Sequence, residues 1–152
     1  MSPAREERSN TDHLSALIVD DNPIIRAILK RVLSSYSVDC DEARDGRGAV
    51  EQFDRRLQAR RPYDMVCLDL GLPEMDGHTA LLHMRAAENQ FQPVVPAYII
   101  VLTAEDDGQA VNQMFSDGAS AYILKPFDHE SFRSHIARIL RQKSSHTKGA
   151  TG

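Results

Sequence analysis

The sequence has few of the features that mark secreted, membrane-spanning or nucleic-acid-binding proteins. Only two of its 152 residues are cysteines. No apolar run approaches the roughly 18 residues of a membrane span, and the polar N-terminus lacks the apolar core of a signal peptide. The formal net charge of −4 provides no positive excess for nucleic acid or anionic lipid. We therefore expect a cytoplasmic protein that by itself binds neither nucleic acid nor a membrane.

The two cysteines, Cys40 and Cys67, both lie in apolar stretches typical of strands. A disulfide is uncommon in the reducing cytoplasm, so we expect buried, reduced thiols. Neither has a histidine or second cysteine at the spacing of a metal site.

The length corresponds to about one domain. Residues 1–13 are polar and unpatterned, and we expect a flexible arm there. Residues 14–141 form the expected globular domain, and 142–152 an expected flexible tail.

Short apolar runs alternate with segments of helical periodicity along the domain. Strands are expected at 14–19, 38–43, 65–69, 98–102 and 121–124. Helices are expected from Pro23 to about residue 33, from Gly46 to Pro62, from Gly77 or His78, from Asp106 or Asp107, and from about 128 to 141. The segment 88–97 is interpreted as a loop. This alternation predicts an α/β protein with a doubly wound parallel sheet covered on both faces.

The first expected helix follows Asn22, a favourable N-cap, and carries its apolar residues at helical spacing. We expect all of them on an inward face: Ile24, Ile25, Ile28, Leu29, Val32 and Leu33. Three basic residues of the same segment are expected to face water: Arg26, Lys30 and Arg31.

Polar side chains follow four of the apolar strands. They are Asp20 with Asp21, Asp69, Thr103 and Lys125. Parallel strands end at the same edge of a sheet, so these groups are expected to converge. Clustered carboxylates suit a hard cation, above all Mg²⁺, and Lys125 adds a charge that favours a phosphoryl group.

Each residue also has a purely structural interpretation. Asp20 and Asp21 could stabilise a helix N-terminus, although Asn22 already supplies a cap. Thr103 and Lys125 could be ordinary residues at strand ends, and Tyr122 a half-buried strand aromatic. The histidines show no spacing suited to metal binding, and none is given a role.

Four motifs occur in order, each at the end of an expected strand. They are Val19-Asp20-Asp21-Asn22, the run LDLGLPEMDG from 68 to 77, Leu102-Thr103-Ala104, and AYILKPF from 121 to 127. With these motifs, residues 16–140 resemble the receiver domain of two-component response regulators, in particular single-domain, chemotaxis-regulator-like members. The resemblance implies a flavodoxin-like sheet of five parallel strands, in the order 2-1-3-4-5, with five helices.

The resemblance also implies residue roles. Asp69 would be the phospho-acceptor, and Mg²⁺ would be bound by Asp20, Asp21, Asp69 and the backbone carbonyl of Gly71. The phosphoryl group would be held by Thr103, the N–H of Ala104, and Lys125.

A conformational switch is implied as well. Thr103 would move towards the phosphate, and Tyr122 would swing inward. The surface of the fourth helix, fifth strand and fifth helix would change for a partner.

Two positions depart from many relatives: Gly71 lacks a side chain two residues after Asp69, and Glu105 lies two residues after Thr103. Both flank the path of a water attacking an acyl phosphate, so we expect them to tune hydrolysis.

The expected function is a phosphorylation switch, not a turnover enzyme. The phosphoryl donor would be a sensor histidine kinase or phosphotransfer protein, and the target would be a downstream protein that the sequence does not identify. The protein would be a monomer or a phosphorylation-dependent dimer. Alternatively, the chain is a receiver module of a hybrid kinase or multidomain regulator. An aspartyl-phosphate phosphatase is disfavoured, because Gly71 stands where its second carboxylate belongs. A flavin carrier is disfavoured by the repulsion between Asp20-Asp21 and the flavin phosphate.

Overall fold

The computed structural model describes residues 13–72, 75–104 and 108–151. Its strands are β1 (Leu14–Val19), β2 (Val38–Ala43), β3 (Met65–Asp69), β4 (Tyr98–Thr103) and β5 (Ala121–Leu124). All neighbouring strands pair in parallel, in the order β2-β1-β3-β4-β5. This confirms the expected sheet and its strand order.

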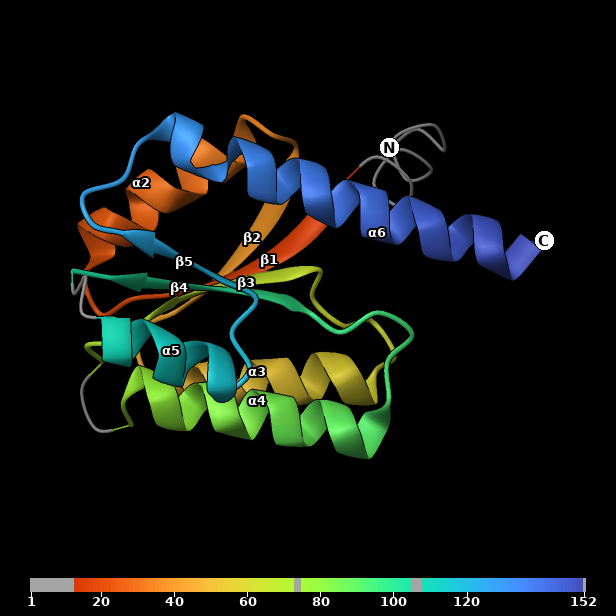
Figure 1. Cartoon of the computed structure of the whole chain (residues 1–152), viewed down its shortest axis with the longest axis horizontal. Helices are drawn as coiled ribbons and strands as arrows, with labels where there is room; N and C mark the ends of the chain where they lie inside the picture. Colours follow the sequence, from red (N-terminus) through yellow and green to blue (C-terminus); the bar gives the residue numbers. More distant parts are fainter. Residues whose placement is uncertain (1–12, 73–74, 105–107, 152) are drawn as a thin grey trace.

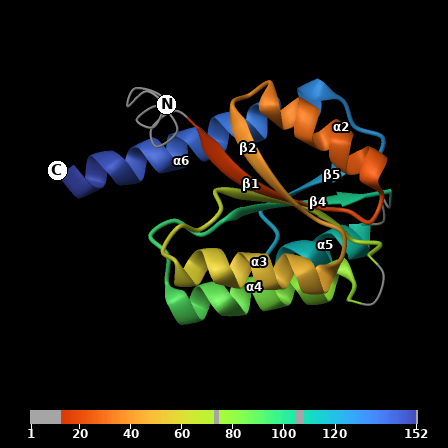
Figure 2. The same ribbon diagram turned by 180° about the vertical axis from the view of Figure 1, so that it is seen from behind.

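Helices cover both faces of the sheet. They are α2 (Pro23–Ser34), α3 (Gly46–Gln58), α4 (Gly77–Phe91), α5 (Gly108–Ser116), the 3-10 helix η1 (His129–Phe132) and α6 (Arg133–Thr151). Helices α2 and α6 lie on one face, and α3, α4 and α5 lie on the other (Figures 1 and 2). Each face has its own apolar core, with Phe132 fully buried on the first and Phe53 almost so on the second. The connections between strands therefore use both sides of the sheet, as expected for a doubly wound fold.

The position of each strand follows from its composition. Every residue of β3 and β4 is buried, which explains their continuous apolar sequences. Strand β2 lies at the edge and exposes Asp39, Asp41 and Glu42 to solvent. Charged side chains on an edge strand oppose pairing with another chain.

Polar residues cap the helices. The Asn22 side chain accepts hydrogen bonds from the N–H groups of Ile24 and Ile25 at 2.9 and 3.4 Å, as the sequence predicted. Asp76 caps α4 by accepting from the Thr79 N–H at 2.8 Å. The expected caps of α5, Asp106 and Asp107, lie outside the described residues.

Helix α4 extends further than the sequence indicated. Residues 88–91, expected to be part of a loop, form its last turn, so the connection to β4 spans 92–97. Glu88 is buried and accepts hydrogen bonds from the Ala97 N–H at 2.7 Å and from Arg85 at 2.5 Å. The expectation was wrong because a buried glutamate has no apolar signature, although its partners make burial possible.

The inward face of α2 is narrower than its apolar sequence suggests. Leu29 and Leu33 are buried, whereas Ile24 and Ile28 are 68% and 45% exposed. Arg26, expected to face water, is half-buried and donates to the Asp20 carbonyl at 2.8 Å. A helix on a sheet buries only one stripe, so periodicity alone overestimated its width.

Two helix ends differ from the sequence-based expectation. Helix α3 ends at Gln58, before Pro62, and Arg60 follows with a left-handed φ of 59°. Helix α6 continues to Thr151 through residues expected to be an unstructured tail. Good helix formers such as Gln142 and Lys143 allow this continuation on a solvated segment.

Both cysteines are free thiols, as expected. Burial raises the pKa of Cys40 to about 12 and also raises that of the fully buried Cys67, which disfavours the reactive thiolate form of both. In the part of the chain that the structure describes, no helix has the length and apolar content needed to cross a bilayer.

Two glycines that each begin a helix give a matched stability test. A Cβ at Gly77 would lie 2.6 Å from Leu70 Cα and 2.7 Å from the Asp69 carbonyl oxygen, whereas a Cβ at Gly108 would meet nothing within 4 Å. We expect Gly77→Ala to lower the free energy of unfolding by about 1–3 kcal/mol, because backbone must move. Gly108→Ala should leave it unchanged or raise it by up to about 1 kcal/mol. Urea denaturation measures both, and equal effects would contradict this packing.

Candidate functional site

The polar residues expected at the strand ends meet at the carboxyl edge of the sheet. Asp20 follows β1, Asp69 ends β3, Thr103 ends β4 and Lys125 follows β5. A cavity of about 340 Å³ opens there. It is lined by Asp69, Leu70, Gly71, Asp76, His78, Thr103, Ala104 and Lys125.

Three carboxylates gather at one side of this cavity. Asp20, Asp21 and Asp69 each offer an oxygen atom, and these atoms lie within 4.8 Å of one another. Asp20 and Asp69 are 1% and 8% exposed, whereas Asp21 is exposed to solvent. Such an all-oxygen set, open to water on one side, matches the requirements of a hard divalent cation such as Mg²⁺.

Lys125 provides the positive charge beside these acids. Its Nζ lies 3.3 Å from Asp69 Oδ1 and 3.4 Å from Asp20 Oδ2. The lysine, which follows β5, therefore contacts both buried carboxylates. One ammonium cannot balance three carboxylates, so the site keeps a negative excess that favours a cation.

The pKa of Asp20 is raised by its burial and by the neighbouring acid. Burial raises the pKa of the Asp20 carboxyl, and the charge of Asp69 raises it further. The Asn22 N–H, which donates to Asp20 Oδ1 at 2.9 Å, and the nearby Lys125 oppose the rise in pKa. A cation bound beside Asp20 would stabilise the ionised form of this buried carboxyl and so lower its pKa.

The loop after β3 positions the backbone around Asp69. The N–H of Gly71 donates to Asp69 Oδ1 at 3.1 Å, and the N–H of Gly77 donates to the Leu70 carbonyl at 3.2 Å. Hydrogen bonding from the Thr79 N–H lowers the pKa of Asp76, which keeps this capping residue charged at the start of α4. The loop is therefore fixed at both ends around the cavity.

The two residues expected to form a switch lie on adjacent strands. Thr103 is 4% exposed at the end of β4. Tyr122 on β5 is 38% exposed, and its ring packs edge-on against Phe115 of α5 with centroids 6.1 Å apart. The tyrosine is thus turned towards the surface formed by α5 and β5.

Two residues at the site were missed by the sequence analysis, and one cannot be placed. His78 lines the cavity, with its Nδ1 3.0 Å from Asp117 Oδ2. Arg26 fixes the backbone carbonyl of Asp20. The sequence feature that could have pointed to His78 is its position, because it directly follows the motif 68–77 that contains Asp69 and the cap Asp76. Glu105 lies outside the described residues.

Comparison with known proteins agrees with this arrangement. The family model of the response regulator receiver domain matches residues 16–137. The chain belongs to this family. Receiver domains are the signalling domains of two-component systems and are not turnover enzymes. The resemblance indicated by the sequence motifs is therefore confirmed.

Individual relatives extend this comparison. The transcriptional regulatory protein SrrA of Staphylococcus aureus is 37% identical over 133 residues, covering 86% of this chain and 49% of SrrA. The chain thus spans about half the length of the curated relatives it matches.

Solved structures show the same fold. The receiver domain of the sensor histidine kinase PA1611 from Pseudomonas aeruginosa, solved with a magnesium ion in its active-site cleft, is 27% identical. It superposes with a TM-score of 0.70 over 84% of this chain and 98% of that domain. CheY of Borrelia burgdorferi, solved with CheX, BeF₃ and magnesium, is 27% identical, with a TM-score of 0.73 over 83% of this chain and 88% of CheY.

Removing one carboxylate should stabilise the protein when divalent cations are chelated. Because the folded pKa of Asp20 is raised, its ionisation costs stability as the pH rises above the ordinary value of 3.8. Asp20→Asn removes this cost and keeps the oxygen that accepts from the Asn22 N–H. We expect the variant to be more stable than wild type at pH 7 in EDTA, by a margin that disappears near pH 3.8.

Thermal unfolding across this pH range measures the margin. Glu51→Gln, which changes an exposed glutamate of α3, is the matched control and should show no such dependence. A margin independent of pH would contradict the raised pKa assigned to Asp20.

Proposed function

We propose that this chain is a phosphorylation switch in which Asp69 accepts a phosphoryl group from a histidine kinase or a phosphotransfer protein. The observation that carries the proposal is the contact of Lys125 Nζ with Asp69 Oδ1, at 3.3 Å, beside Asp20 and Asp21. A carboxylate that lies next to both an ammonium group and an acidic cation site has the charges that phosphoryl transfer requires.

The contacts of Asp69 also suggest which of its oxygens reacts. Oδ1 is held by the Gly71 N–H and by Lys125. In the proposed step Oδ2 attacks phosphorus, a P–O bond to Asp69 forms, and the P–N bond of the donor phosphohistidine breaks with the electron pair leaving on the imidazole nitrogen. A carboxylate is a weak nucleophile, but it has no proton to lose when it attacks, so the step needs no general base.

We assign the cation site to the side chains of Asp20, Asp21 and Asp69 and to the backbone carbonyl of Gly71. The oxygen set fits Mg²⁺, and the related PA1611 receiver domain was solved with magnesium in its cleft. Bound there, Mg²⁺ would neutralise charge on the phosphoryl oxygens. The chain's own contribution is to orient these oxygens and to place Lys125 on the other side of the phosphoryl group.

The remaining phosphoryl contacts are assigned to the Thr103 hydroxyl and the Ala104 N–H, both at the cavity. If Thr103 moves to the phosphate, Tyr122 can leave its place against Phe115 and turn inward. The surface of α5, β5 and α6 would then differ between the two states. A downstream protein or a second copy of the chain would read this difference.

An exposed apolar patch beside the acceptor is suited to the donor protein. Ile25 and Ile28 of α2 line an apolar groove of about 400 Å³. Its other lining residues are Lys125, Pro126 and Phe127. Ile24, next to it on α2, is 68% exposed. A helix of the donor packed here would bring a phosphohistidine to the edge at which Asp69 lies.

The proposed switch does not depend on the context of the chain. It would serve a free-standing regulator, or a module of a longer kinase or regulator such as SrrA, of which the chain spans about half. The free thiols fit the reducing cytoplasm, which we propose as its location. An aspartyl-phosphate phosphatase remains disfavoured, because Gly71 places no carboxylate two residues after Asp69.

Incubation with acetyl phosphate and Mg²⁺ tests the acceptor. Intact-mass measurement should show the gain of one phosphoryl group in wild type and none in Asp69→Asn, because the amide cannot form the acyl phosphate. Asp39→Asn is the matched control and should be modified like wild type. Equal modification of Asp69→Asn and wild type would contradict the proposal, and EDTA should prevent modification in every variant.

The lifetime of the acyl phosphate should depend on Gly71 and Glu105. A Cβ at Gly71 would lie 3.8 Å from Asp69 Oδ1, an ordinary contact, so Gly71→Asn can fold and partly block the attacking water. We expect it to lengthen the half-life of the phosphorylated protein several-fold, and Glu105→Ala to change the half-life as well. Decay of the phosphorylated mass after removal of acetyl phosphate measures both. Unchanged half-lives in both variants would show that this pair does not control hydrolysis.

A further inference from the structure

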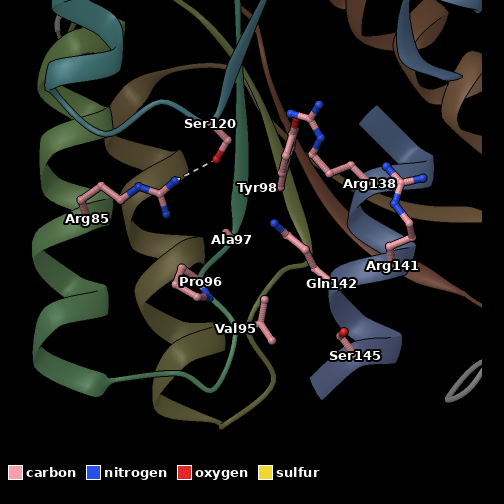
Figure 3. A pocket seen from close by; sticks show the side chains of 10 residues that line it. All are labelled: Arg85, Val95, Pro96, Ala97, Tyr98, Ser120, Arg138, Arg141, Gln142 and Ser145. Carbon is pink, nitrogen blue, oxygen red and sulfur yellow. Dashed lines mark hydrogen bonds between the residues drawn. The ribbon is translucent and has the colours of Figure 1, made fainter. Parts of the chain in front are cut away.

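A second and larger cavity lies at the opposite end of the sheet. Its volume is about 630 Å³, within the range of small-molecule sites. It opens where β4 and β5 begin, at Tyr98 and Ser120, and lies between α4 and α6 (Figure 3). The acceptor Asp69 is at the other end of β3, so the two cavities are separate.

The charges around this cavity are of one sign. Three arginines line it, and no aspartate or glutamate does so among the described residues. Arg85 is already paired with the buried Glu88 and also donates to the Gly118 carbonyl at 2.8 Å and to Ser120 at 3.2 Å. It is a fixed wall of the cavity.

Arg138 and Arg141 differ from Arg85. They lie three residues apart on α6, which places them on one side of the helix. Neither forms an ion pair with any residue that the structure describes, and Arg138 only approaches the Tyr98 hydroxyl at 3.5 Å. Burial, and next the charge of Arg138, lower the pKa of the neighbouring His135, as expected for a guanidinium that no acid neutralises.

The other walls are provided by two segments described above. Residues 95–97 of the α4–β4 connection form an apolar side, and their position is fixed by the hydrogen bond from the Ala97 N–H to Glu88. Gln142 and Ser145 belong to the part of α6 that extends past the expected end of the domain. In Figure 3 the Gln142 side chain reaches from α6 towards Ala97, between these walls.

From this arrangement we propose that the cavity binds a small organic phosphate. Arg138 and Arg141, which form no ion pair with a described residue, match the two charges of a phosphate monoester better than the single charge of a carboxylate. Val95 and Pro96 offer an apolar surface for the organic part, and Gln142 and Ser145 offer polar groups to orient it. The volume exceeds what a phosphate ion alone requires. This site is additional to the proposed phosphorylation switch and does not depend on it.

Adenosine 5′-monophosphate is a suitable probe, with adenosine, inorganic phosphate and acetate as comparisons. Each is titrated into ¹⁵N-labelled protein in EDTA, which keeps the acidic cluster unfavourable for anions. We expect the nucleotide to shift the amide resonances of Tyr98, Ser120 and Gln142, inorganic phosphate to bind more weakly, and adenosine and acetate to leave these resonances unchanged. Arg138→Gln and Arg141→Gln should each raise the Kd by about tenfold.

Arg133→Gln is the matched control, because Arg133 lies on α6 but is paired with Glu130. It should leave the Kd unchanged. Arg138 contacts Tyr98, so Arg141→Gln, which breaks no such contact, guards against a folding artefact. The proposal is overturned if the nucleotide shifts no resonance at the cavity, if it shifts only those of Gly71 and Ala104, if adenosine acts equally, or if Arg141→Gln binds like wild type. If inorganic phosphate bound as tightly as the nucleotide, the proposal that the cavity recognises the organic part of the ligand would be overturned.

Discussion

The contact between Lys125 and the two buried carboxylates is the interaction on which the site depends. Asp20 and Asp69 lie on neighbouring strands, and their mutual repulsion would oppose folding if no positive charge reached them. Lys125 reaches them from β5, two strands away from β3 in the sheet, so the pairing order of the strands is what brings the opposite charges together. The negative charge that Lys125 leaves unbalanced favours the binding of a cation at this site.

The rest of the fold supplies a rigid frame for this contact. Strands β3 and β4 are buried along their whole length, and a separate apolar core covers each face of the sheet. Asp69 and Thr103 therefore lie where these strands leave the core, and close packing on both faces of the sheet holds the strand backbones in place. The movements of the proposed switch are therefore assigned to side chains at or beyond this edge, and not to the strand backbones. Tyr122 is one of these, since it lies half-exposed against Phe115.

The alternation of strands and helices and the grouping of Asp20, Asp69 and Lys125 could be predicted from local patterns and the geometry of parallel sheets. The strand order was implied by the resemblance to receiver domains. The exposure of Ile24 and Ile28 could not be predicted, since periodicity gives the direction of a helix face but not the width of its contact. Glu88 was missed because its burial depends on Arg85 and on the amide of Ala97, a partner nine residues away. His78 was missed for a related reason: its place at the cavity depends on how the loop after β3 folds.

Strand β4 takes part in both cavities, with Tyr98 at one and Thr103 at the other. Its six residues span about 20 Å, and an extended, fully hydrogen-bonded strand resists compression along its axis. If a ligand at one cavity displaced this strand along its axis, the residues at the other cavity would move with it. Thermodynamic linkage makes such an influence mutual, so that the occupancy of either end would set the affinity of the opposite one by the same factor.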